Sequence, residues 1–172
     1  ELDYQWAAAR QGAQKLRDEG VSEVLLQGEG SLPALIKRFR SKRDSVLVGT
    51  MSLWQGVDVV GDSCRLVVID KIPFPHPKNP IVKALTEDAD RQGGKGFFQV
   101  SVTRAALMMA QGAGRLLRSH NDRGVVAVLD SRLHSRSYGR FIIQSMPEFW
   151  RTCDLDVVTG ALERLNAVLH ED

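Results

Sequence analysis

The chain has few cysteines, no long apolar run and no marked excess of charge. Its two cysteines, Cys64 and Cys153, show none of the short CxxC-type spacings that a metal site or a disulfide framework needs. No apolar run approaches the roughly 18 to 20 residues that span a bilayer, and the first residues lack the basic-then-apolar order of a secretory signal. These absences predict a soluble protein with reduced thiols and a cytoplasmic location.

Charge and histidine content identify no partner. The 23 Lys and Arg residues nearly balance the 21 Asp and Glu residues, and a net charge of +2 is too small to indicate nucleic acid by itself. The basic run at 37–43 is read more simply as a helix end that carries cations to complement its dipole. The four histidines show no ligand spacing, so no metal is assigned to them. A length of 172 residues with 43% apolar content predicts a single domain over 1–172.

The GxxxxGK[ST] loop that holds nucleotide phosphates is also missing. The glycine-rich segment 93–96 is no substitute, because it does not connect a core strand to a helix N-terminus with that spacing. The chain is therefore expected to be unable to hold ATP in the usual way by itself.

Strand and helix patterns alternate along the chain. Apolar positions three and four apart predict helices over 4–18, 81–91, 100–117 and 156–169, together with one that Ser31 caps. Short apolar runs predict strands at 24–26, 46–48, 66–69 and 125–129, with 66–69 apolar throughout, as in a sheet covered on both faces. This alternation predicts an α/β three-layer sandwich with a mostly parallel central sheet, in which ligands bind at the carboxyl ends of the strands.

The segment 49–58, GTMSLWQGVD, directly follows one of these predicted strands. It concentrates glycines, hydroxyls and a carboxylate, and the hydroxyls of Thr50 and Ser52 are suited to holding a phosphate oxygen. A simple turn closed by Asp58 and Gly61 explains the residues alone about equally well.

The segment 111–118, QGAGRLLR, ends the long predicted helix. Arg115 and Arg118 are three residues apart and share a helix face, and two guanidinium groups on one face suit an anion such as phosphate. From the residues alone, a structural role is favoured: the two arginines would complement the dipole of a helix C-terminus and bond to Asp122 or Asp130.

Taken together, the two segments resemble motifs V and VI of the DinG/XPD branch of superfamily 2 helicases. Residues 49–58 resemble the motif V form G-[TS]-x-S-[FW]-W-[EQ]-G-x-D, and residues 111–118 match the QxxGRxxR of motif VI. Residues 70–80, DKIPFPHPKNP, are similar to the KLPF-x-x-P stretch that follows motif V in this branch. The resemblance covers roughly 44–150, and the strand that carries motif IV is not recognisable before Tyr4.

The resemblance implies a RecA-like (P-loop NTPase-like) second motor domain of an ATP-dependent DNA helicase. Such a helicase would move 5′ to 3′ on single-stranded or forked DNA in repair or replication, with no membrane partner and, in a bacterium, near the nucleoid. ATP and Mg²⁺ would be held mainly by an N-terminal RecA-like domain of the same protein. Any iron–sulfur cluster would lie outside this chain, and the isolated chain is expected to be inactive.

The resemblance also implies residue roles. Arg115 and Arg118 would reach the γ-phosphate, with Arg118 as the arginine finger, and Gln111 would orient the site. The residues implied to bind ATP are Asp58, Gln55, Gly56 and Gly114, and those implied to bind nucleic acid are Thr50, Ser52, Trp54, Phe74 and His76. Packing of the proline-rich loop is nearly as good a reading of Phe74.

Two rival functions remain open at this point. One is a non-catalytic module with the same fold that binds nucleic acid or another protein, which the intact motif arginines argue against. The other is an RNA-directed helicase domain, against which the segments WQGVD and KIPFPHP favour DNA.

Overall fold

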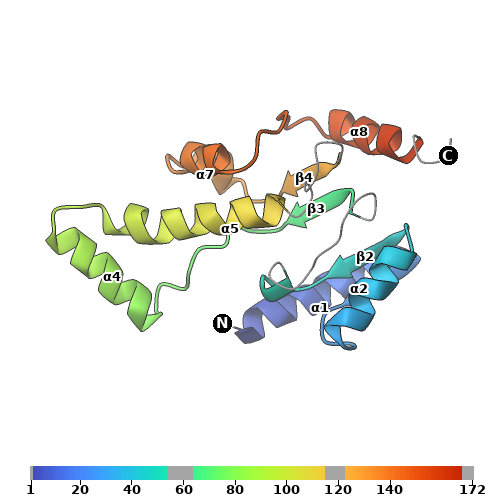
Figure 1. Ribbon diagram of the computed structural model, residues 1–172, viewed down its shortest axis with the longest axis horizontal. Helices are drawn as coiled ribbons and strands as arrows, with labels where there is room; N and C mark the ends of the chain where they lie inside the picture. Colours follow the sequence, from blue (N-terminus) through green and yellow to red (C-terminus); the bar gives the residue numbers. More distant parts are fainter. Residues whose placement is uncertain (1, 54–63, 115–122, 168–172) are drawn as a thin grey trace. The chain divides into compact units, whose positions relative to one another are not determined.

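The computed structural model describes residues 2–53, 64–114 and 123–167 (Figure 1). The chain divides into two compact units, 1–63 and 64–172, and each unit contains one pair of parallel strands. Across the described ranges, no helix has the length and apolar character needed to cross a membrane. The mixed α/β class and the parallel strand direction agree with the sequence prediction.

The first unit consists of two helices and two strands: α1 (Leu2–Asp18), β1 (Glu23–Leu26), α2 (Leu32–Ser41) and β2 (Ser45–Val48). Gly20 ends α1 with a φ of +83°, a left-handed conformation that glycine adopts without a steric penalty. β1 pairs with β2 in parallel, from Glu23 opposite Ser45 to Leu26 opposite Val48. The core is formed where small side chains of α1 pack on β1: Ala9, Ala13, Val24 and Leu26, with Leu16, Val21 and Val48 around them.

The basic run at 37–43 has a structural partner. Glu23, at the start of β1, is buried and forms ion pairs with Arg38 and Lys42 of the run. The hydrogen bonds from these two cations hold the pKa of Glu23 below its usual value. Ser31 occupies the N-cap of α2 as predicted, but its side chain makes no capping hydrogen bond.

The second unit is larger. Its elements are β3 (Leu66–Ile69), α4 (Pro80–Arg91), the π-helix η2 (Phe97–Val102), α5 (Thr103–Ala113), β4 (Val125–Val128), α6 (Arg132–Ser135), α7 (Gly139–Ser145) and α8 (Leu155–Ala167). β3 pairs with β4 in parallel, from Leu66 opposite Val125 to Ile69 opposite Val128. Helix α7 lies beside α5 (Figure 1). The largest fully buried side chains among the described residues are Val102 of η2, Met109 of α5 and Ile142 of α7.

Three features of this unit differ from the sequence prediction. The long helix begins at Phe97, and its first six residues form a π-helix in which the Thr103 N–H reaches the carbonyl of Phe98, five residues earlier. The short helices α6 and α7 were not predicted. β3 is not covered on both faces among the described residues, since Leu66 is 43% and Val68 is 53% exposed.

Candidate nucleotide and nucleic-acid site

A hydrogen-bond network joins the carboxyl ends of β1 and β2. The side-chain oxygen of Gln27 accepts from the Thr50 backbone N–H at 3.0 Å, and the Gln27 amide nitrogen donates to the Ser52 hydroxyl at 2.9 Å. The hydroxyls of Thr50 and Ser52 lie 2.9 Å apart. Two of the residues predicted to bind nucleic acid are therefore brought together, and a third residue holds them in place.

Gly49 makes room for this arrangement. A Cβ atom at this position would lie 2.5 Å from Oε1 of Gln27, closer than non-bonded atoms approach, so a larger residue would displace the glutamine. The glycine thus admits a neighbouring side chain to the backbone of the loop. Sequence reasoning missed Gln27, although the rule that points to the residues after a core strand applies equally to β1.

The two hydroxyls differ in accessibility. Thr50 is 7% exposed, whereas Ser52 is exposed to solvent. Because a phosphate oxygen must be reached from solvent, Ser52 is the accessible residue of the pair, and its hydroxyl is held by Gln27 and Thr50.

A second network joins the carboxyl ends of β3 and β4. Asp130 accepts from the Arg132 side chain through Nε at 2.9 Å and Nη2 at 2.6 Å, and from the Ile72 backbone N–H at 3.0 Å. The Arg132 guanidinium, ahead of the two backbone donors, holds the pKa of Asp130 at about 2. Asp70, Lys71 and Leu129 line a shallow pocket together with Asp130, Ser131 and Arg132.

Replacing Asp130 with asparagine is expected to lower the free energy of unfolding by about 1–2 kcal/mol at pH 7, because the bidentate ion pair is lost. The Asp130 side chain is 6% exposed but that of Arg132 is 43% exposed, so solvent screens part of the attraction between them and keeps the expected loss in this range. Its pKa is lower in the folded than in the unfolded chain, so the stabilisation is present above pH ~4 and is lost as the pH falls towards ~2. Chemical unfolding of both proteins between pH 2 and pH 7 measures this difference.

Asp70→Asn is the matched control for that experiment, since Asp70 directly follows the partner strand β3 but is exposed. It is expected to change stability by less than about 0.5 kcal/mol. If the free energies of unfolding of the wild type and Asp130→Asn differ by the same amount at every pH, the stabilisation does not come from ionised Asp130, and the prediction is wrong.

Phe74 lies against the second network. The Arg132 guanidinium lies 5.6 Å from the centre of the Phe74 ring, within the range of a cation–π contact. The ring also contacts Tyr138, with 5.2 Å between centroids, and remains half-buried. His76, two residues on, accepts a hydrogen bond from the backbone N–H of Lys78 at 3.2 Å.

The described part of motif VI is the end of α5. Gln111 lies in the last turn of the helix with its side chain exposed, and Gly114 caps the helix by donating its N–H to Ala110 at 2.9 Å. The remaining predicted site residues lie outside the described residues: Trp54, Gln55, Gly56, Asp58, Arg115 and Arg118.

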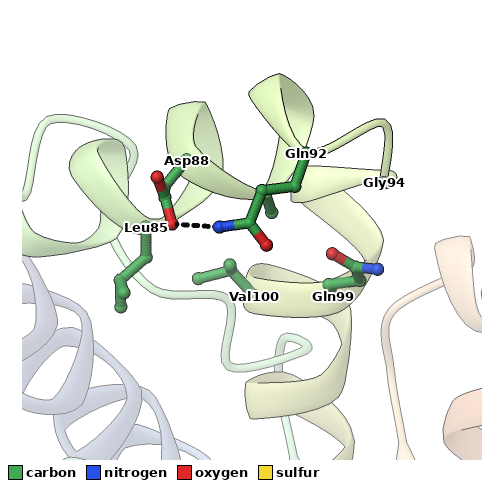
Figure 2. Close-up of a pocket in the computed structure, with 7 residues that line it drawn as sticks. Leu85, Asp88, Gln92, Gly94, Gln99 and Val100 are labelled. Carbon is green, nitrogen blue, oxygen red and sulfur yellow. Dashed lines mark hydrogen bonds between the residues drawn. The ribbon is translucent and has the colours of Figure 1, made fainter.

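Another pocket lies between α4 and η2 (Figure 2). Asp88 of α4 and Gln92, the C-cap residue after α4, face Gln99 and Val100 of η2, and the Gln92 amide donates to Asp88 at 2.8 Å. All of its lining residues lie outside the two predicted motifs. No group of three or more His, Cys, Asp or Glu side chains suited to a metal ion occurs within the parts of the chain that the structure describes.

Comparison with known proteins identifies the family. The sequence profile of the helicase C-terminal domain matches residues 4–149. The chain is 48% identical over 158 residues to the ATP-dependent helicase DinG of Mycobacterium tuberculosis, covering 92% of this chain and 24% of that protein. It is 43% identical to the ATP-dependent DNA helicase YoaA of Escherichia coli (87% of this chain, 23% of the relative) and 39% identical to the 3'-5' exonuclease DinG of Bacillus subtilis (73% and 14%).

The chain spans about a quarter or less of the length of these relatives. The profile match includes both strand pairs, the hydroxyl network at Thr50 and the ion pair at Asp130. On these grounds the chain belongs to the helicase C-terminal domain family, in the form found in DinG-type helicases.

Proposed function

We propose that the chain is the C-terminal motor domain of an ATP-dependent DNA helicase. The observation that carries this proposal is the Gln27–Thr50–Ser52 network, which fixes the solvent-exposed Ser52 at the ends of parallel strands in a member of this family, while the Thr50 backbone N–H is taken up by Gln27. Side-chain hydroxyls are among the groups that proteins use to hold the phosphates of nucleic acid without regard to sequence.

The fold proposed for the whole chain is a single RecA-like domain with one central sheet between two helical layers. Its support is that both strand pairs are parallel and that the family profile runs across both units. The apolar side chains of Leu66 and Val68 on β3 are exposed, whereas parallel sheets occur almost only with both faces covered by helices. A second helical layer over this face is therefore part of the proposed fold.

In the proposed mechanism, this domain binds DNA and completes a nucleotide site that the N-terminal motor domain provides. Ser52 contacts a DNA phosphate, and Thr50 positions it through the shared hydrogen bond. Trp54, Phe74 and His76 contribute the remaining contacts to the strand. ATP, when bound, supplies the triphosphate whose hydrolysis drives domain closure and opening, and each state offers different contacts to the DNA.

On the nucleotide side, Arg115 and Arg118 neutralise charge on the γ-phosphate, and Gln111 orients the site from the exposed end of α5. The backbone at Gly114 and the segment containing Gln55, Gly56 and Asp58 complete the contacts to ATP. Mg²⁺ is bound by the N-terminal domain. Movement from 5′ to 3′ and a role in DNA repair belong to the same proposal.

Assays of the full-length protein test the proposal. It is expected to unwind a forked DNA substrate with ATP and to leave a matched RNA fork largely intact, whereas the isolated 172-residue chain is expected to hydrolyse no ATP above background. Equal unwinding of RNA would favour the RNA-directed alternative. Absence of DNA-stimulated hydrolysis in the full-length protein would favour a non-catalytic binding module, and turnover by the isolated chain would show that this chain holds the nucleotide by itself.

A further inference from the structure

Three aromatic rings from separate segments of the second unit meet at one surface. Phe74 comes from the loop after β3, Phe97 begins η2, and Tyr138 is the N-cap of α7. Their ring centroids lie 5.2 Å (Phe74–Tyr138), 5.7 Å (Phe74–Phe97) and 6.0 Å (Phe97–Tyr138) apart. We call these three residues the aromatic platform. Phe97 and Tyr138 belong to neither helicase motif.

The platform is open to solvent. Phe97 is 53% exposed, and Phe74 and Tyr138 are half-buried. The Phe74 ring meets Tyr138 edge to face at 80° and also carries the Arg132 guanidinium, so the exposed Phe97 offers the most open ring of the three. Mutual contacts fix the rings, and fixed rings bind a third flat partner at a smaller entropic cost than mobile ones.

The segments that carry the rings are basic throughout. Residues 71–80, 92–104 and 131–145 contain seven Lys and Arg residues and no Asp or Glu. The rest of the chain contains sixteen Lys and Arg residues and twenty-one Asp and Glu residues. Asp70 and Asp130 lie at the borders of these segments, and Asp130 is the partner of Arg132. Asp90 of α4 accepts a hydrogen bond from the Gly96 backbone N–H beside Phe97. Cations interleaved with exposed aromatic rings are the pattern of a surface that binds single-stranded nucleic acid.

We propose that the aromatic platform stacks unpaired bases of single-stranded DNA, while the surrounding cations attract the strand's phosphates. The inference rests on the proposed function and extends it from one loop residue to a surface built by three segments. Stacking on an aromatic ring is tolerant of sequence because every base has a π-face, which suits a protein that moves along DNA.

The adenine of ATP is also a planar aromatic base, so ATP is the other source of a base that could stack on the platform. The charge distribution favours DNA, because cations spread over three segments match an extended polyanion better than a single triphosphate. Measurements of DNA and nucleotide binding on the same variants separate the two sources.

The test uses the full-length protein and two fluorescent strands of equal length, oligo(dT) and its abasic analogue, which keeps the phosphates but lacks the bases. Phe97→Ala and Tyr138→Ala are each expected to weaken oligo(dT) binding about fivefold or more, as loss of a base–aromatic stack does. The same variants should bind the abasic strand like the wild type. Tyr138→Phe, which keeps the ring, should retain oligo(dT) affinity.

Phe98→Ala is the matched control. Phe98 directly follows Phe97 in the chain but pairs with Phe141, outside the platform, and its loss should leave oligo(dT) binding unchanged. Three results would overturn the inference: unchanged oligo(dT) affinity in Phe97→Ala and Tyr138→Ala, an equal loss on the abasic strand, or weakened nucleotide affinity with intact DNA affinity. If the wild type itself binds neither strand, the proposed function fails, and the stacking inference fails with it.

Discussion

Replacing Arg118 by alanine in the full-length protein is expected to abolish DNA-stimulated ATP hydrolysis while nucleotide binding persists. An arginine that stabilises the charge of the transferring phosphoryl group contributes about 10³ to 10⁵ in rate in phosphoryl-transfer enzymes. The nucleotide's main contacts are assigned to another domain, so the loss should appear in kcat and leave affinity nearly unchanged. Steady-state ATPase assays with saturating single-stranded DNA, together with equilibrium binding of a nucleotide analogue, measure the two quantities separately.

Arg151→Ala provides the control for that variant. Arg151 is an exposed arginine in the loop before α8, outside both helicase motifs, and its removal changes the net charge by the same amount. Its ATPase rate should equal that of the wild type. If the Arg118→Ala enzyme hydrolyses ATP at the wild-type rate, Arg118 does not stabilise the transition state. If the variant loses nucleotide affinity together with activity, Arg118 contributes to binding the nucleotide in the ground state.

The second large effect is expected from Gly139→Ala at the start of α7. A Cβ atom there would lie 1.8 Å from the carbonyl oxygen of Leu133 in α6, so alanine fits only if the joint between α6 and α7 shifts. Both helices pack tightly at this joint: Leu133 is buried in α6, and Ile142, one turn into α7, is fully buried. We expect a loss of about 3 kcal/mol in the free energy of unfolding, and a drop in Tm of about 6–12 °C by calorimetry.

Gly12→Ala should have the opposite sign and serves as its control. Gly12 lies within α1, and a Cβ atom added there meets nothing within 4 Å. Alanine in a helix interior is more stable than glycine by about 0.5–1 kcal/mol, so this variant should melt slightly higher than the wild type. If Gly139→Ala unfolded at the wild-type temperature, the α6–α7 joint would have to be loose enough to accept a methyl group.

The sequence allowed most secondary structure to be predicted because that structure follows local rules. The four strands and the helices α1, α4 and α8 fall within three residues of their predicted bounds, and α2 begins directly after Ser31, its predicted cap. Helices α6 and α7 escaped prediction because they are short, and a four-residue helix such as α6 leaves almost no periodic signal. The π-helix is equally invisible, since its extra residue is a matter of backbone hydrogen bonding.

The candidate site follows in part from a similar reason. Thr50, Ser52 and Phe74 are candidates because they lie in segments that resemble family motifs, and their roles stay predictions. Gln27 and Tyr138 lie outside those segments, and their contacts depend on tertiary packing that a single sequence does not contain. The low exposure of Thr50 also depends on tertiary packing: its hydroxyl chemistry suggested a direct phosphate contact, but the residue is only 7% exposed.

The π-helical turn at the start of the long helix changes the direction in which the side chains before it point, relative to those of α5. A regular α-helix advances about 100° per residue, so one additional residue in a turn rotates the preceding side chains by about that angle relative to those that follow. Phe97 and Phe98 therefore point in directions that an uninterrupted α-helix continuing into α5, with its buried Met109, would not offer them. A one-residue deletion within 99–102 would leave the hydrophobic face of α5 in register and turn both rings to a different side of the helix.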